Sequence, residues 1–312
     1  MNALIIGGAG FVGKYLIEHL ANDCNYSVSA TKLPNEVIKS DLCKVYDLNI
    51  LNPNEIENVL IHSNPDVIFH LSAQSSVKLS WENPQLTIDV NIKGSLNVLD
   101  TVRKLNIDPK IILIGSGEEY GYIKENECPI KEDNKIRAGN IYAVTKATQN
   151  MIGSVYAKAY NMNIVLVRAF NHVGAGQMPM FVVSDFCKQI AEIEKGLRQP
   201  IMNVGNLSAQ RDFTNVRDVV RAYGLLAKYG KKGETYNVGS GVGVSIQQIL
   251  DTALSYSNMD ITIQRDPNRM RPSDVPIIVA DISKIFGDTG WKPQISLNDT
   301  ILEVLNYWRN SI

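Results

Sequence analysis

The stretch that decides the fold is residues 3–20, ALIIGGAGFVGKYLIEHL. The apolar run Ala3–Gly7 is typical of a strand that is buried on both faces. Apolar residues then recur at helical spacing over Phe11–Leu20, which predicts a helix directly after a glycine-rich turn. A strand, a tight turn and a helix in this order indicate the start of an alternating α/β fold.

The turn has glycine at positions 7, 10 and 13, a GxxGxxG spacing. Glycine allows a tight turn, a close approach of the backbone to a pyrophosphate, and close packing of helix against strand. The helix N-terminus adds unpaired N–H groups and the positive end of its dipole. A glycine-rich turn alone would be weak evidence, but this context favours dinucleotide binding by Gly7, Gly10, Phe11, Val12 and Gly13.

The same alternation continues along the first half of the chain. Strands are predicted at Tyr26–Thr31, Asp66–Leu71, Lys110–Gly115 and Asn163–Phe170, and helices at Pro53–Ile61, about Gln85–Leu105 and Asn140–Tyr160. This order predicts an α/β protein with a doubly wound parallel (Rossmann) sheet. After Phe170 the pattern loosens. We therefore expect a dinucleotide-binding domain over residues 1–170, joined by part of 212–243, and a smaller, partly discontinuous α/β substrate domain over 171–312.

The composition excludes several classes of protein. The 312 residues carry 31 Lys+Arg and 32 Asp+Glu, a net charge of −1, without the basic stripe that broad nucleic-acid binding requires. No apolar run approaches the ~20 residues that span a bilayer, and the N-terminus lacks the basic start of a signal peptide. Four cysteines and four histidines are dispersed, which argues against disulfides and a metal site. We expect a cytoplasmic globular protein that binds neither membrane nor nucleic acid.

The residue after the second strand bears on the cofactor. The strand ends at Thr31-Lys32, where a site specific for NAD usually presents Asp or Glu to the ribose 2′-OH. No carboxylate stands there, so Lys32 could meet the 2′-phosphate of NADP. NADP(H) is therefore favoured, while NAD(H) and a solvated, surface role for Lys32 stay open.

A Tyr-x-x-x-Lys pair occurs twice, as Tyr120/Lys124 and Tyr142/Lys146. The first pair is predicted on a loop, whereas the second lies in a predicted helix, where i and i+4 share a face. A lysine ammonium near a phenol lowers the pKa of the tyrosine from about 10, so that it can exchange a proton with a carbonyl oxygen. Ser116 follows a strand and could bind the same oxygen. The glycine turn favours this catalytic set over a solvated helix face with a turn serine.

Taken together, these motifs resemble the extended short-chain dehydrogenase/reductase family, which acts largely on nucleotide sugars. The similarity runs nearly from end to end and includes His70–Ala73, Asn91, Arg211–Phe213 and Gly290–Pro293. Segments Gly115–Gly121, Phe170–His172, Gly205–Leu207 and Arg271–Val275 are similar to the branch that handles GDP-linked deoxy sugars. Within this branch the 4-keto-sugar reductases are more similar than the 4,6-dehydratases.

The resemblance implies further site residues. Added to the cofactor site are Thr31, Lys32, Asp47, Leu48, Leu71, Ser72, Ala73 and Asn91, with Tyr142 and Lys146 at the ribose. Added to the substrate site are Ser116, Asn171, Asn206, Arg211, Arg271 and Asp274. Arg211 and Arg271 would clamp the diphosphate, since a guanidinium suits phosphate geometry, while for Arg269 both a phosphate contact and a solvated loop position stay open. A homodimer through an intermolecular four-helix bundle is also implied.

The function expected from this resemblance is NAD(P)H-dependent reduction of the C4 keto group of a GDP-6-deoxy-4-keto-hexose, giving a GDP-deoxyhexose such as GDP-rhamnose. Gly117 stands where the dehydratases carry a polar residue, which favours the simpler chemistry, although Glu118 could still act as a base. Asp274 stands where the relatives usually carry Glu. The alternatives are a 4,6-dehydratase or 4-epimerase with retained NAD(P) and, remotely, a noncatalytic nucleotide-binding protein.

Overall fold

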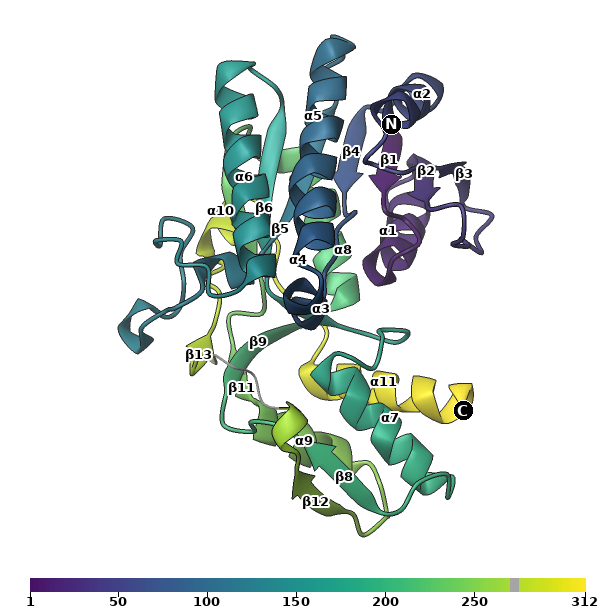
Figure 1. The fold of residues 1–312 in the computed structure, drawn as a ribbon, viewed down its shortest axis with the longest axis vertical. Coiled ribbons are helices and arrows are strands. Elements are labelled where there is room, and N and C mark those ends of the chain that lie inside the picture. The colour runs from purple at the N-terminus through teal and green to yellow at the C-terminus, as the bar shows by residue number, and fades with distance from the viewer. Residues whose placement is uncertain (270–274) are drawn as a thin grey trace.

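The structure is a computed structural model, and it describes residues 1–269 and 275–312 (Figure 1). Arg271 and Asp274, both predicted to bind substrate, lie outside the described residues. Seven parallel strands form the main sheet in the order β10-β6-β5-β4-β1-β2-β3. Their bounds are β1 Asn2–Ile6, β2 Ser27–Lys32, β3 Cys43–Asp47, β4 Val67–His70, β5 Lys110–Ser116, β6 Ile164–Ala169 and β10 Thr235–Val238. The predicted doubly wound parallel sheet is confirmed.

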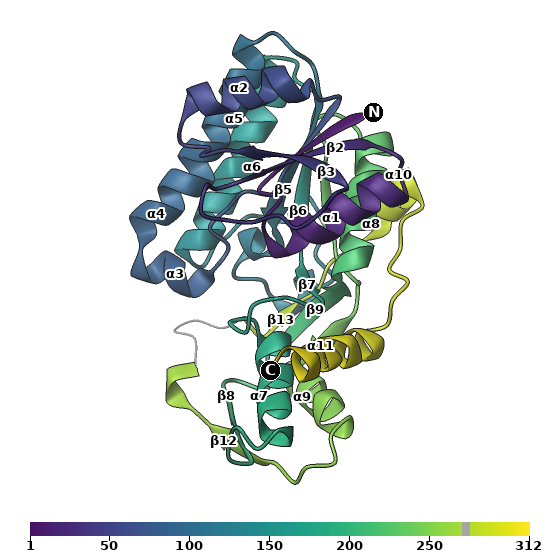
Figure 2. The same cartoon turned by 90° about the vertical axis from the view of Figure 1, so that its right-hand side faces the viewer.

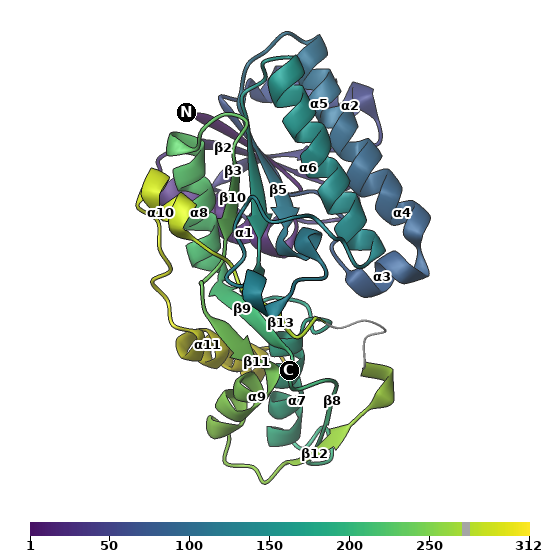
Figure 3. The same cartoon turned by 90° about the vertical axis from the view of Figure 1, so that its left-hand side faces the viewer.

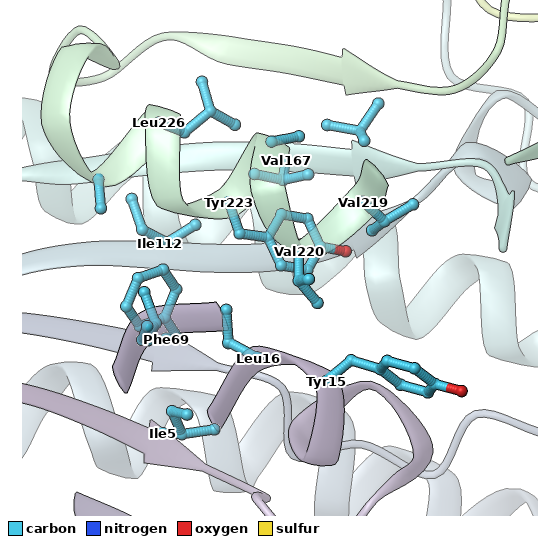
Figure 4. Close-up of a cluster of buried hydrophobic side chains, with 14 of the residues drawn as sticks. Ile5, Tyr15, Leu16, Phe69, Ile112, Val167, Val219, Val220, Tyr223 and Leu226 are labelled. Carbon is cyan, nitrogen blue, oxygen red and sulfur yellow. The ribbon is translucent and has the colours of Figure 1, made fainter. Parts of the chain in front are cut away.

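Helices cover both faces of this sheet (Figure 2). One face carries α2 (Pro53–Ser63), α5 (Ser95–Lys104) and α6 (Ile141–Ala159), and the other α1 (Phe11–Asn22), α8 (Val216–Tyr229) and α10 (Ser283–Thr289). Leu16 of α1, Phe69 of β4 and Tyr223 of α8 meet in the core between α1, α8 and the sheet (Figure 4). Full burial of a side chain such as Leu16 contributes about 1.5–3 kcal/mol.

The parallel register brings the carboxyl ends of the central strands to one edge of the sheet. Ile6 of β1 pairs with His70 of β4, and Ser116 of β5 pairs with Ala169 of β6. Residues that directly follow these strands therefore gather at that edge, which is where ligands of open α/β sheets bind.

The other half of the molecule, drawn at the bottom of Figure 3, contains two small sheets whose strands the sequence analysis did not locate. One contains β7 (Asn171–Val173), β9 (Gln210–Asn215), β11 (Gly243–Ser245) and β13 (Ile277–Ile278), and the other pairs β8 (Ile201–Val204) with β12 (Thr262–Arg265). Helices α7 (Val182–Glu194), α9 (Ile246–Ser255) and α11 (Leu297–Ser311) share a second core with them. Because α8, β10 and α10 pack with the main sheet, the proposed cofactor-binding part takes segments from beyond residue 170.

The long helix expected at Gln85–Leu105 is interrupted. It consists of α4 (Pro84–Ile88), a π turn over Asp89–Gly94, and α5, and a further short helix, α3 (Val77–Glu82), precedes it. A π turn holds one extra residue per turn, and such turns are frequent at functional sites. In the described residues, no helix is long and apolar enough to cross a membrane.

Candidate active site

The glycines at positions 7, 10 and 13, in the β1–α1 turn and the first turn of α1, have different constraints. Gly7 has a φ of +90°, and a Cβ on it would lie 2.8 Å from the backbone of Ser72. A Cβ on Gly13 would lie 2.3 Å from the carbonyl oxygen of Gly8. Around Gly10, by contrast, the nearest atom would be 3.5 Å away, which is ordinary contact. The chain itself therefore requires Gly7 and Gly13, while at the exposed Gly10 a Cβ would meet no close contact.

The N-terminus of α1 suits an anion. Gly10 is its N-cap residue, no side chain caps the helix, and no acidic residue lies in the first turn, where Phe11 and Val12 follow. The buried Thr31 accepts a hydrogen bond from the Gly7 N–H at its Oγ1, 3.1 Å away, and so fixes the turn. Uncapped N–H groups and the positive helix end fit the pyrophosphate of a dinucleotide.

The loop after β4 is held from two sides. The Leu71 N–H donates to the carbonyl of Ile6 at 2.9 Å, so Leu71, Ser72 and Ala73 continue from the strand beside the glycine turn. The fully buried Asn91, in the π turn, accepts from the Gln74 N–H at 2.8 Å and donates to the Gln74 carbonyl at 3.0 Å. Its amide also donates to Thr145 Oγ1 of α6 at 2.9 Å. Asn91 therefore ties this loop to the helix that carries Tyr142.

Lys32 has a partner that the sequence analysis did not foresee. Its ammonium lies 2.5 Å from Asp47 Oδ1, at the end of the neighbouring strand β3. The side chain of Lys32 is only 18% exposed, whereas that of Asp47 is 60% exposed. The buried Leu48 follows and donates its N–H to the Lys32 carbonyl at 2.8 Å. A cation and a carboxylate therefore stand together where the 2′ position of a cofactor ribose was expected.

Ser116 and Tyr142 come together at the end of β5. The Ser116 hydroxyl is near enough to the Tyr142 phenol to affect its pKa, and Ser116 Oγ accepts from the Glu118 N–H at 3.2 Å. Burial raises the pKa of Tyr142 well above its ordinary value of 10, the Ser116 hydroxyl opposes this, and Glu118 and Glu119 raise it further. The predicted lowering of this pKa is therefore wrong in direction, because burial and the two glutamates raise it and together outweigh the Ser116 hydroxyl. Tyr142 is a phenol at neutral pH.

Lys146 lies one turn after Tyr142 and is buried in a polar network. Its ammonium donates to Gln149 Oε1 at 2.7 Å, Gln149 contacts the Ser95 hydroxyl, and Ser95 is 2.8 Å from His70 Nε2. Burial lowers the pKa of Lys146 to about 8, with the carboxylate of Glu119 raising it. Burial and the nearby ammonium lower the pKa of His70 to about 3. His70 is thus neutral, and the Lys146 ammonium is the charged group of this network.

The two glutamates after Ser116 lie in different surroundings. Glu118 is half-buried and accepts from the Asn140 amide at 3.2 Å, at the start of α6. Glu119 is fully buried and paired with Arg168 of β6 at 3.1 Å. The sequence analysis missed Glu119, whose signal was the acidic pair directly after a buried strand. It also missed Gln149, for which the sequence has no signal.

Of the predicted substrate residues, Asn171, Asn206 and Arg211 lie in the second half of the chain, whereas Ser116 ends β5. Asn171 donates to the Asp212 carbonyl at 3.2 Å, and Asn206 accepts from the Ser208 N–H at 3.0 Å. Arg211, which is 8% exposed, donates to the carbonyls of Gln210 and Val275, at 2.8 and 2.7 Å. Its neighbour Asp212 accepts from the N–H groups of Ser240 and Gly241 in the loop after β10 and of Ala280 after β13, and is therefore structural.

Arg269 is also paired. Its guanidinium lies 2.5 Å from Asp185 of α7 and 3.8 Å from Asp266.

The described residues contain no group of His, Cys, Asp or Glu side chains that could hold a metal ion. The arrangement thus offers a phenol–hydroxyl pair, a buried ammonium and an anion-binding turn, which together suit proton transfer to a carbonyl oxygen beside a dinucleotide.

Comparisons with known proteins extend this description. The family model for GDP-mannose 4,6 dehydratase matches residues 4–304. The chain is 29% identical over 308 residues to GDP-6-deoxy-D-mannose reductase of Pseudomonas aeruginosa, covering 99% of this chain and 97% of that protein. It is also similar to the solved structure of RMD from Pseudomonas aeruginosa complexed with NADPH, with a TM-score of 0.89, 27% identity and all of both chains covered. For UDP-glucose 4-epimerase of Thermus thermophilus in complex with NAD, the TM-score is 0.90 and the identity 26%, again over all of both chains.

Proposed function

The chain belongs to the GDP-mannose 4,6-dehydratase family, whose members are nucleotide-sugar enzymes of the extended short-chain dehydrogenase/reductase type, and we propose that it is a reductase. Its substrate is a GDP-6-deoxy-4-keto-hexose, whose C4 keto group is reduced to give a GDP-deoxyhexose such as GDP-rhamnose. The similarity to GDP-6-deoxy-D-mannose reductase and to a reductase-type structure complexed with NADPH supports this choice.

The observation that carries the proposal is the state of Tyr142. A ketone that accepts hydride becomes an alkoxide and needs an acid beside it. A tyrosine whose pKa is raised by burial retains its proton at neutral pH and can supply it. The Ser116 hydroxyl, which lies beside the Tyr142 phenol, orients the same oxygen. The residues therefore suit reduction of a carbonyl group.

A bound nicotinamide nucleotide supplies the hydride. The uncapped start of α1, which begins after the exposed Gly10, binds the pyrophosphate of such a cofactor, and the Lys146 ammonium binds its ribose. Ser72 and its neighbours close the turn from the other side. These assignments follow the family resemblance and the fit of the site.

The rival reaction, dehydration with a retained cofactor, needs a second acid–base group. Gly117 offers none, and a Cβ on it would lie 3.0 Å from the ring of Phe170, so a larger side chain would require that ring to shift. Glu118, half-buried beside Asn140, is the side chain in the site that favours the rival. Because a single carboxylate lacks the partner that the dehydratases provide, reduction is the function proposed.

The direct test is incubation with a panel of GDP-, dTDP- and UDP-linked 4-keto-6-deoxy sugars while the absorbance of NADPH is followed. The proposal predicts stoichiometric oxidation of NADPH with the GDP-linked sugar. Conversion of a GDP-sugar without net oxidation would identify a retained-cofactor enzyme instead.

Arg211 is proposed to meet the diphosphate of this substrate, as is Arg271 from the family resemblance.

Cofactor preference is predicted to depend on the Lys32–Asp47 pair. Lys32→Asp places two carboxylates at the 2′ position, so the ratio of kcat/KM for NADPH to that for NADH should fall about tenfold or more. Asp47→Asn frees Lys32 and should raise the same ratio. Lys44→Asp, an equal charge change on exposed β3 away from its carboxyl end, is the control. Equal ratios in all four proteins would remove Lys32 from the cofactor site.

A homodimer is predicted from the apolar face of α6. Val144, Met151 and Val155 lie at i, i+7 and i+11 on one helix face and are 49%, 65% and 58% exposed. Leu86, Ile88 and Leu96 of the neighbouring helical segment are also exposed. A patch of this kind marks an association surface, and a two-fold dimer is the commonest assembly.

Met151→Glu buries a charge in that interface and should convert the dimer to a monomer at micromolar concentration, as measured by sedimentation velocity. Leu197→Glu makes the same change at a residue that is 67% exposed elsewhere on the molecule and should leave the dimer intact. A monomeric wild-type protein, or a dimer that persists in Met151→Glu, would refute the predicted bundle.

A further inference from the structure

Directly behind Ser116 lies a buried ion pair that the proposed mechanism does not use. Glu119 is 0% exposed, and the side chain of its partner Arg168 is 12% exposed. Buried charges are costly and are retained only where their partners satisfy them. We propose that Glu119 is a positioning residue of this site: its carboxylate holds the Ser116 backbone and keeps Lys146 in its charged form. This inference rests on the proposed function for the roles of Ser116 and Lys146.

The hydrogen bonds of Glu119 fit a carboxylate. Oε1 accepts from the Ser116 N–H and from the Asn150 amide, each at 2.8 Å. Oε2 accepts from the same amide at 2.9 Å and from Arg168 Nε at 3.1 Å. Each of these partners is a donor, so the ionised form is the one that they satisfy. The bond to Ser116 fixes the residue whose hydroxyl meets Tyr142.

The neighbouring strand leaves space for this carboxylate. A Cβ on Gly115 would lie 2.2 Å from Glu119 Oε1 and 2.3 Å from Asn150 Nδ2. Glycine is unfavourable inside a strand unless another group must approach closely. Gly115 is therefore the residue that allows Glu119 and Asn150 to meet beneath the site.

The same contact places Glu119 on the side of Lys146. Asn150 lies one turn after Lys146 on α6, so the two side chains share a helix face, and both are buried. Lys146 interacts with the charge of Glu119, which raises the pKa of the ammonium against the effect of burial. Without this carboxylate, the described members of the hydrogen-bonded network around Lys146 are the neutral side chains of Gln149, Ser95 and His70.

Several other titratable groups lie around Glu119 and Lys146. They are Arg168 of β6, His70 of β4, Tyr142 of α6, Glu118 and Tyr120 of the 3-10 turn Gly117–Tyr120, and Glu132, whose carbonyl accepts from Arg168. Arg168 also donates to the Tyr120 hydroxyl at 2.9 Å, so its guanidinium interacts with Glu119 and Tyr120 rather than with Lys146. Glu119 is thus the carboxylate whose removal most changes the field at the ammonium.

The test measures the ionisation of Lys146 directly and needs no substrate. The protein is labelled with ¹³C lysine, the ¹³Cε resonance of Lys146 is assigned by its loss in Lys146→Arg, and its shift is followed against pH. The wild-type midpoint is expected near about 8. In Glu119→Gln it should move down by about one pH unit or more, because the neutral amide no longer favours the ammonium. Glu119→Asp, which keeps the charge, should stay near the wild-type midpoint.

Glu127→Gln is the matched control, since Glu127 is likewise paired with an arginine, Arg137 at 2.7 Å, but outside the site. It should leave the midpoint unchanged. If Glu119→Gln does not fold, Glu119→Leu/Arg168→Met removes the pair without leaving an unpaired charge and should show the same downward shift. A midpoint unchanged in the folded variant would overturn the inference. Absence of reductase activity in the wild type would instead refute the proposed function and leave this titration readable.

Discussion

Tyr142→Phe is expected to reduce turnover by about 10²–10⁴-fold while NADPH affinity stays within about twofold of wild type. The substitution removes only the hydroxyl that protonates the new alkoxide, and loss of a general acid costs about this much. The ring remains, so the packing at the start of α6 is kept. Single-turnover kinetics measure the chemical step, and fluorescence titration with NADPH measures binding.

Tyr156→Phe is the control for this prediction, because Tyr156 lies on the same helix and packs against Tyr160, away from Ser116. It should turn over at the wild-type rate. If Tyr142→Phe retains near wild-type turnover, Tyr142 is not the acid and the proposed catalytic set is wrong.

Lys146→Met is expected to lower both turnover and NADPH affinity, each by about tenfold or more. Methionine fills the volume of the buried stem but removes the ammonium that is proposed to hold the ribose. Because burial lowers the pKa of Lys146 to about 8, the ammonium is present below that pH and is lost above it. Wild-type NADPH affinity should therefore fall as pH rises through about 8.

Lys146→Met should show no inflection of affinity in that pH range, although its affinity is weaker throughout. Isothermal titration from about pH 6 to about 10 measures both proteins. An inflection that persists in Lys146→Met would mean that another group titrates there, and equal affinities would remove Lys146 from the cofactor site.

Much of the fold could be predicted because its signals are local. The run Ala3–Gly7, the glycines of the turn and the spacing of Tyr142 and Lys146 each lie within a few residues. Strand and helix alternation then fixes the parallel sheet, since crossovers have one hand. The resemblance carried by these motifs, and the fold class, are confirmed by the matching family and by the similar solved structures.

What the sequence did not predict depends on contacts between distant segments. Glu119 and Arg168 are 49 residues apart, and only the pairing of β5 with β6 brings them together. The direction of the pKa shift of Tyr142 follows from burial, which no local pattern reports. The π turn at Asn91 and the small sheets are likewise set by packing against other elements. The sequence alone therefore predicted an uninterrupted helix around Asn91 and located none of the strands of the small sheets.

The most direct test of the proposed reductase uses NADPH in which both hydrogens on C4 of the nicotinamide ring are deuterium. This cofactor is incubated with the GDP-linked 4-keto-6-deoxy sugar. The product is analysed by mass spectrometry and proton NMR. The account predicts one deuterium per product molecule, located at C4 of the sugar, and one NADPH oxidised for each sugar reduced. Product without deuterium at C4, formed without net loss of NADPH, would contradict it and identify an enzyme that retains its cofactor.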